Sequence, residues 1–178
     1  PLADFDNNLI KYNGAQNLLI NKADLFENKD HVVFVVMKQN EKGSWSNIYG
    51  SAKLWDLDEE ARLQVGFSSS ESYRINFWGN DTYPSISSDF KEKLTSEFVV
   101  LAFHWKTGEK KDIYENDEKI EGDVPDSHFN PIGLMTGGVS LGYVIEGNQG
   151  GFDGDIKEFI VINYQRNFNM YMPMNLIL

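Results

Sequence analysis

The chain has 178 residues, enough for one domain with a sizeable core, and its formal net charge is -11, from 16 Lys and Arg against 27 Asp and Glu. Phosphate backbones and anionic lipid headgroups would repel such a chain, so the charge argues against nucleic acid and membrane insertion. A cation or a neutral sugar is compatible with it. The sequence has no cysteine, which leaves neither a disulfide framework nor a thiol nucleophile.

Short apolar or alternating segments, separated by Gly, Asn, Asp and Ser, recur about every ten residues along the chain. This rhythm is typical of a β-sandwich or barrel, because alternate side chains of a strand face opposite sides of a sheet. Helix is predicted only as single turns, at 22–26 and 89–94. The predicted strands cover residues 9–12, 18–20, 31–38, 46–52, 62–67, 73–78, 98–105, 110–115, 139–142 and 156–164.

Two of these strands, 31–38 and 98–105, are apolar on both of their alternating faces. Strands of this kind belong in the middle of a sheet that is covered on both sides. Later in the chain, Asn116 and Asp117 separate two short strand candidates. They predict a two-residue hairpin turn, because Asn and Asp tolerate the positive φ that such turns require.

The C-terminal segment, 167–178, differs from the rest of the chain in its apolar content, so the domain is predicted to cover 1–166. The tail is predicted to pack along its own sandwich. The alternatives are that it docks on a neighbouring molecule or leads into a further region. Its apolar residues surround Pro173 and are Met170, Met172, Met174, Leu176, Ile177 and Leu178.

The most specific motif is the segment 150–167, Gly-Gly-Phe-Asp-Gly-Asp-Ile-Lys-Glu-Phe-Ile-Val-Ile-Asn-Tyr-Gln-Arg-Asn. Its glycines at 150, 151 and 154 predict a sharp bend at a sheet corner, and the strand after Ile156 is expected to supply core side chains. The segment resembles the closing strand of concanavalin A-like, laminin G-like domains. In that family a Gly-rich loop leads into Phe, then Gly-Asp-Ile, Glu and an alternating apolar strand.

Upstream features follow in the family's order, since 9–14 resembles the opening strands and 139–142 resembles the strand before the closing motif. The resemblance implies an all-β fold, a two-sheet antiparallel jelly-roll sandwich. It implies less about function, because lectins, adhesion modules, glycosidases and virion components share this fold.

Catalysis is not expected. Retaining glycosidases on this fold carry acids at alternate positions of one strand, with the two catalytic carboxyl groups about 5 Å apart. Asp56, Asp58 and Glu60 have that spacing. However, Glu59 intrudes between them, and such a string is more typical of a solvated turn. The three histidines are predicted to be structural, and they are His31, His104 and His128.

A calcium ion is the cofactor that the sequence favours, because hard carboxylate and carbonyl oxygens suit it. Asp153 and Asp155 flank Gly154 in the closing motif, and the resemblance implies a structural Ca²⁺ near this strand, with carbonyl groups from the region of Asn13 and Gly14. The alternative is that Asp155 only caps a turn by accepting hydrogen bonds from backbone N–H groups.

A sugar site needs an exposed aromatic ring with polar groups around it, because the C–H face of a sugar is apolar and its hydroxyls need donors and acceptors. Trp78, Asn80, Asp81 and Tyr83 fit this description, at a strand end that runs into a loop. Trp45, in a Gly-Ser-Trp-Ser-Asn loop, is the second candidate. The alternative is that each Trp closes the edge of the core.

These observations predict a non-catalytic binding or assembly module, a lectin-like domain that recognises a glycan or protein as part of a larger surface or virion complex. A purely structural capsid or scaffold domain is the nearest alternative, and a jelly-roll glycoside hydrolase is a more distant one. The predicted location is extracellular, on a cell surface or in a virion.

Overall fold

A computed structural model describes residues 4–6, 9–13, 17–40, 46–52, 63–68, 72–77, 80–82, 85–109, 111–120, 132–142 and 151–164. Nearly all of the regular structure is β, as predicted. The elements are β1 (Asp4–Asp6), β2 (Leu9–Asn13), β3 (Leu18–Ile20), β4 (Asp30–Gln39), β5 (Ser46–Ser51), β6 (Leu63–Phe67), β7 (Tyr73–Phe77), β8 (Asn80–Thr82), α1 (Ser88–Lys93), β9 (Val99–Trp105), β10 (Asp112–Glu115), β11 (Glu118–Ile120), β12 (Val139–Leu141) and β13 (Asp153–Tyr164).

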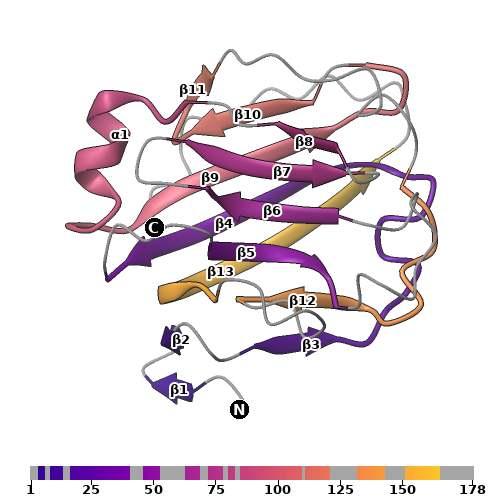
Figure 1. Cartoon of the computed structure of the whole chain (residues 1–178), viewed down its shortest axis with the longest axis horizontal. Helices are drawn as coiled ribbons and strands as arrows, with labels where there is room; N and C mark the ends of the chain where they lie inside the picture. Colours follow the sequence, from indigo (N-terminus) through magenta and orange to yellow (C-terminus); the bar gives the residue numbers. More distant parts are fainter. Residues whose placement is uncertain are drawn as a thin grey trace.

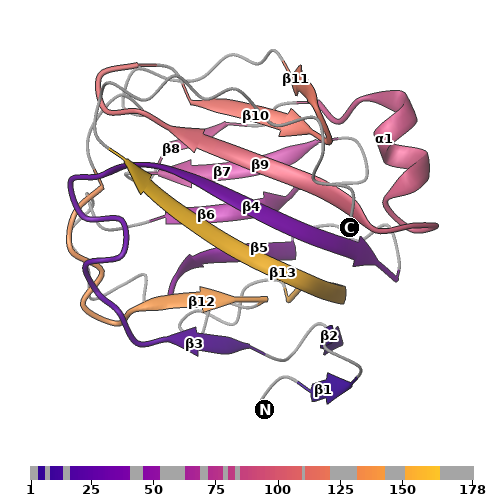
Figure 2. The ribbon, with the colours of Figure 1, turned by 180° about the vertical axis from the view of Figure 1, so that it is seen from behind.

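The strands form two antiparallel sheets that stack face to face (Figures 1 and 2). The seven-stranded sheet has the order β1-β2-β13-β4-β9-β10-β11, and the six-stranded sheet has the order β3-β12-β5-β6-β7-β8. Within the described residues, both sheets join strands that are far apart in sequence. This arrangement is the predicted two-sheet jelly-roll sandwich.

The two strands predicted to be central, β4 and β9, are confirmed in that position, since β4 is the middle strand of the seven-stranded sheet and β9 is its neighbour. On its other side β4 pairs with β13, from Asp30 opposite Tyr164 to Gln39 opposite Gly154, with a register shift between Ile156 and Glu158. The closing motif is therefore an inner strand of this sheet.

The core lies between the sheets and consists of the inward-facing residues of both. Val33, Val35 and Met37 of β4 alternate with outward-facing residues, as the period of a strand requires. Tyr49 of β5 reaches across from the six-stranded sheet, and its ring centroid lies 5.7 Å from that of Phe103 and 5.5 Å from that of Phe159. Aromatic side chains thus join the two layers.

A buried carboxylate also links the two sheets. Glu115 of β10 is 3% exposed, and its Oε1 accepts a hydrogen bond from Tyr73 Oη of β7 at 2.9 Å. The backbone N–H of Ser87 donates to the same Oε1 at 3.1 Å, and the Ser87 hydroxyl donates to Oε2. Ser87 occupies the N-cap of α1 but makes no side-chain cap bond, because its hydroxyl serves Glu115.

Gly154 has a different role from the predicted bend at a sheet corner. It lies inside β13, paired with Tyr12 of β2 and Gln39 of β4. A Cβ at this position would come within 2.2 Å of the Lys38 carbonyl oxygen. The glycine is needed because neighbouring backbone approaches closely.

Most other predictions about local structure are confirmed. The hairpin at Asn116 has the positive φ of 55° that the sequence indicated, and the predicted helical turn at 89–94 overlaps α1.

Two segments differ from the prediction. Residues 22–26 form turns rather than a helical turn. Asn80, Asp81 and Thr82, predicted to begin a loop, form edge strand β8, because they pair with β7. None of the helices in the described residues is long and apolar enough to span a membrane.

Candidate functional site

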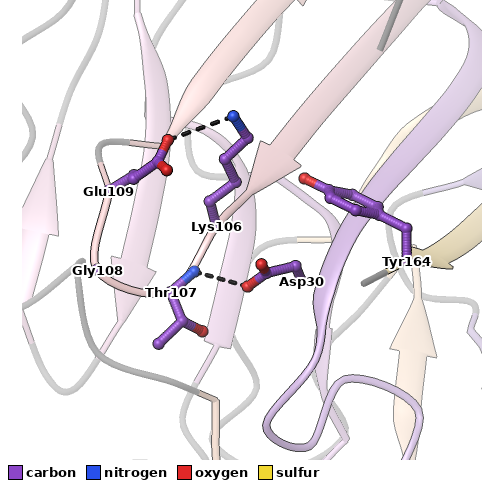
Figure 3. A pocket seen from close by; sticks show the side chains of 6 residues that line it. All are labelled: Asp30, Lys106, Thr107, Gly108, Glu109 and Tyr164. Atoms are coloured by element: carbon purple, nitrogen blue, oxygen red, sulfur yellow. Dashed lines mark hydrogen bonds and ion pairs between the residues drawn. The ribbon is translucent and has the colours of Figure 1, made fainter. Parts of the chain in front are cut away.

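A pocket of about 190 Å³ opens at one end of the sandwich, where β4 begins and β9 and β13 end (Figure 3). Asp30 is the first residue of β4, and Tyr164 is the last residue of β13. The rest of the lining comes from the turn after β9, Lys106 to Glu109. The site is therefore assembled from three segments that the sheet register brings together, since Tyr164 lies opposite Asp30.

Hydrogen bonds hold the turn that lines the pocket. The Thr107 backbone N–H donates to Asp30 Oδ1 at 2.8 Å, and Lys106 Nζ lies 3.3 Å from Glu109 Oε2. Beneath the turn, Lys111 Nζ donates to the Lys106 carbonyl oxygen at 2.6 Å and to the Glu109 carbonyl oxygen at 3.4 Å. These hydrogen bonds connect the turn to Asp30 of β4 and to Lys111, the residue before β10.

The side chain of Lys111 is buried. Its ammonium lies 4.3 Å from the centre of the Trp105 ring, a cation–π contact. Burial lowers the pKa of Lys111 to about 7, although Asp30 and Glu109 act in the opposite direction. Lys111 therefore supports the pocket from below, while the lining itself supplies two carboxylates and one ammonium.

A polar chain extends from the pocket across the outer face of the seven-stranded sheet. The Tyr164 hydroxyl is hydrogen-bonded to His104 Nε2, and His104 Nδ1 lies 3.8 Å from Asp112 Oδ2. Asp112 Oδ1 in turn pairs with Lys119 Nζ at 2.7 Å. Burial and the nearby Lys106 charge lower the pKa of His104, so the imidazole is neutral near pH 7 and its Nε2 accepts a hydrogen bond from the Tyr164 hydroxyl.

The hydroxyl of Tyr164 is a hydrogen-bond donor in this pocket. Burial, followed by the negative charges of Asp30, Glu109 and Asp112, raises the pKa of Tyr164, so its hydroxyl stays protonated and acts as a donor. The described residues contain no group of three or more His, Cys, Asp or Glu side chains placed to hold a metal ion. A phenol ring with carboxylates and an ammonium beside it can bind a small polar molecule.

The residue that follows Asp30 in β4 is a buried histidine. His31 is 1% exposed, its ring lies between Phe26 and Trp105, and its Nδ1–H donates to the Lys29 carbonyl oxygen at 2.9 Å. Burial lowers the pKa of His31 to about 4. Its predicted structural role agrees with this burial.

Acidification is expected to destabilise the protein through His31. Its pKa is about 4 in the folded state and 6.5 ordinarily, so the unfolded chain takes up the proton first as the pH falls. Between pH 7 and 5 this group should lower the free energy of unfolding by about 2 kcal/mol. Urea unfolding at both pH values measures the change. The His31→Phe variant, measured alongside, should lose stability less steeply, and equal pH slopes for both proteins would contradict the assignment.

Most of the residues that the sequence analysis singled out lie outside the described part of the chain. These are the sugar-site candidates Trp45, Trp78 and Tyr83, the acids of the predicted solvated turn, Asp56, Asp58 and Glu60, and His128, which is predicted to be structural. Asn80 and Asp81 are placed on β8, without a description of their side chains. The C-terminal tail, 167–178, is likewise outside the described residues, so its predicted packing is untested.

The predicted calcium residues, Asp153 and Asp155, lie next but one to each other on β13. Asn40 Nδ2 donates to Asp153 Oδ1 at 2.8 Å, and Asn13 is the register partner of Asp153 on β2, the region from which carbonyl ligands were expected. Asp155 is flanked in register by Lys11 and Lys38, whose ammonium groups would compete with a cation for its carboxylate. The calcium site stays a prediction.

Sequence reasoning missed the pocket. Thr107 and Gly108 between two strands do indicate a turn, and Gly108 has a φ of 79°. Charged residues in a turn are ordinarily solvated, however, and nothing local to Asp30 or Tyr164 indicates that they meet there. Only the pairing of β4 with β13 and β9 brings these three segments together.

The two sheets and their strand order define a jelly roll of the concanavalin A-like, laminin G-like type, as the closing motif suggested. No family model and no curated protein matches the sequence, whereas solved structures match the fold. The CBM40 of a Ruminococcus gnavus IT-sialidase, bound to alpha2,3 sialyllactose, superposes with a TM-score of 0.64 at 11% identity, over 86% of this chain and 88% of that one.

Two further structures share the architecture. Domains LG4-5 of the mouse laminin alpha1 chain give a TM-score of 0.62 at 9% identity, over 86% of this chain and 41% of that chain. Tailspike protein 2 of the Escherichia coli O157:H7 bacteriophage CAB120 gives 0.60 at 13% identity, over 89% of this chain and 23% of that chain. At these identities the likeness establishes the fold.

Proposed function

We propose that this domain is a non-catalytic glycan-binding module of an extracellular, cell-surface or virion assembly. The observation that carries the proposal is the pocket at the end of the sandwich, where the Tyr164 ring lies beside Asp30, Lys106 and Glu109. A phenol ring suits the apolar face of a sugar, and the charged groups suit its hydroxyls. Structures of the same fold include a carbohydrate-binding module, which supports a binding role.

A neutral glycan fits this pocket better than an acidic one. Its lining holds two carboxylates against one ammonium, and that ammonium already pairs with Glu109. The whole chain carries a charge of -11, which would repel a sialylated ligand. The volume of about 190 Å³ lies below the range of drug-sized pockets, so it admits one sugar ring rather than a long oligosaccharide.

Strand β7, which directly precedes the predicted tryptophan site in the sequence, runs toward the same end of the sandwich as the pocket. The end of β7 and the ends of β9 and β13 point in the same direction in both views (Figures 1 and 2). Trp78 follows β7 directly in the sequence. A Trp78→Ala variant, measured on the same glycan array as the pocket variants, tests whether Trp78 contributes to binding.

Screening the full chain on an array of neutral and sialylated glycans tests the proposal. We expect neutral glycans to bind, and we expect Glu109→Ala and Tyr164→Ala to weaken binding about tenfold, equivalent to about 1.4 kcal/mol. Glu97→Ala is the matched control, because Glu97 is exposed and precedes β9 at its opposite end. An array without hits, or wild-type affinity in both pocket variants, would sink the proposal.

The same array, run in CaCl₂ and in EDTA, tests the calcium prediction. Binding that is weakened by EDTA and restored by CaCl₂ would support a structural ion near Asp153 and Asp155. An identical glycan profile and an identical melting temperature in both buffers would count against it. Because these readouts concern the ion, they leave the pocket hypothesis separately testable.

A structural capsid or scaffold role is the second candidate, and one observation favours it. Phe98, Ile160 and Ile162 are exposed at 39%, 37% and 44%. Exposed apolar side chains that gather on one face are typical of interaction surfaces. The oligomeric state and the occupant of this face distinguish a scaffold from a monomeric binding module.

A further inference from the structure

The outer face of the seven-stranded sheet is apolar at its centre. Alternate residues of β4, β9 and β13 face the core, so their neighbours face outward. Three of the five large hydrophobic residues that are exposed in the described part of the chain lie here. The outer apolar face consists of Val32, Phe34, Val36, Phe98, Val100, Ala102, Ile160 and Ile162. Phe98, which precedes β9, is exposed, as are Ile160 and Ile162, whereas Val32, Val36 and Ala102 are buried.

No labelled helix or strand covers this face. Figure 2 looks onto it, and β13, β4 and β9 lie in front of β5, β6 and β7 there. Its residues are neighbours across the strands, since Ile160 pairs with Phe34, and Phe34 pairs with Ala102. The exposed Ile160 therefore lies beside the half-buried Phe34 in one row of apolar residues across the three strands.

The sequence beyond β13 has a pattern that complements this surface. From 168 to 178 every even-numbered residue is apolar, and the odd-numbered residues between them are mostly Asn, Tyr and Pro. This period of two predicts an extended segment with one apolar side. Eleven residues would extend about 35 Å. The six apolar residues are Phe168, Met170, Met172, Met174, Leu176 and Leu178.

Position and charge also favour the tail as the occupant of the face. Residues 165–178 follow Tyr164, an outward residue of β13, so the segment starts at one end of the face. Their single charged residue is Arg166, which suits a neighbourhood that contains Asp30 and Glu109. A second copy of the chain would instead bring another net charge of -11 against the first.

We propose that residues 168–178 lie extended across the outer apolar face of their own chain, with the even-numbered side chains against Phe34, Ile160 and Ile162. Tethering to β13 favours this contact, because a linked segment has a high effective concentration at its site. Pro173 suits the arrangement, since it lacks an N–H and is disfavoured in a central strand but tolerated in a segment without a full ladder.

Methyl NMR on the full chain tests the contact directly. We expect nuclear Overhauser effects between a methionine methyl of Met170, Met172 or Met174 and the methyls of Ile160 or Ile162. In a mixture of differently labelled chains these effects should be absent between molecules. Their absence within one molecule would overturn the proposal. Effects found only between molecules, together with a dimeric mass, would overturn it in favour of assembly through this face.

A pair of charge-matched variants provides the second readout. Met172→Asp puts a carboxylate on the apolar side of the segment, whereas Asn175→Asp puts one on the opposite side. We expect Met172→Asp to abolish the methyl contacts, increase binding of the dye ANS and lower the melting temperature by about 4 °C. Asn175→Asp should resemble the wild type. Equal behaviour of the two variants would contradict the proposed orientation.

Discussion

Replacing Glu115 with alanine is expected to lower the free energy of unfolding by about 4 kcal/mol, since hydrogen bonds to a charged group contribute about 1.5–3 kcal/mol each. The substitution removes the acceptor for Tyr73 Oη and for the N–H and hydroxyl of Ser87. It leaves the Tyr73 hydroxyl buried without its partner, and it breaks a polar link between the two sheets. Chemical denaturation measures the loss.

Two variants make the Glu115 result interpretable. Glu118→Ala is the matched control, because Glu118 is exposed and lies directly across the same hairpin. It should change stability by less than about 0.5 kcal/mol. Tyr73→Phe removes one of the hydrogen bonds and should cost about 1–2 kcal/mol. If Glu115→Ala proved no worse than Glu118→Ala, the buried network would not contribute as described.

Gly142→Ala is expected to cost about 3 kcal/mol or more, from backbone strain and overpacking together. Gly142 follows β12 with a φ of 80°, a left-handed conformation that L-residues rarely adopt. An added Cβ would also come within 2.1 Å of Tyr12 Cε1. The Tyr12 ring is buried and packs edge-on against Phe152, so it has little room to move.

A double-mutant cycle separates the two causes of the Gly142 effect. Tyr12→Leu removes the ring that the new methyl group would meet. In that background the cost of Gly142→Ala should fall to about 1 kcal/mol, the contribution of the left-handed backbone. Additive effects of the two substitutions would show that the predicted contact with Tyr12 does not matter.

The fold could be predicted because its longest strands carry their own signal. Strands β4 and β9 are apolar on both faces, and Asn116 supports a positive φ at the hairpin turn. Strand β8 carries no such signal. Asn80, Asp81 and Thr82 read as a loop, and they become a strand only because β7 offers a partner.

The closing motif illustrates how a correct pattern can support an incorrect local interpretation. The motif around Gly154 predicts the fold correctly, but the bend that it also predicts at this glycine is absent. In the sheet Gly154 is flanked on both sides by strands, and the close approach of Lys38 from β4 is what excludes a side chain. Composition alone does not distinguish a turn from a close contact, because glycine serves both.

The pocket could not be predicted because it depends on register rather than on a motif. Asp30 and Tyr164 are far apart in sequence, and their meeting depends on how β13 pairs with β4. An aromatic residue followed by Asn and Asp, as at Trp78, is a visible local pattern and therefore attracted the sugar-site prediction. Trp78 and Tyr83 lie outside the described residues. The proposed binding measurements are therefore needed to test the sugar-site prediction.

The lengths of the outermost strands have a consequence for the behaviour of the domain in concentrated surroundings. Strands β1 and β11 border one sheet, β3 and β8 border the other, and each has three residues within the described part of the chain. A foreign polypeptide would find few unpaired amide and carbonyl groups there for templated growth of a fibril. Within the described residues, the edges of both sheets therefore offer little for amyloid-like stacking, and contacts with other molecules are left to the faces of the sandwich.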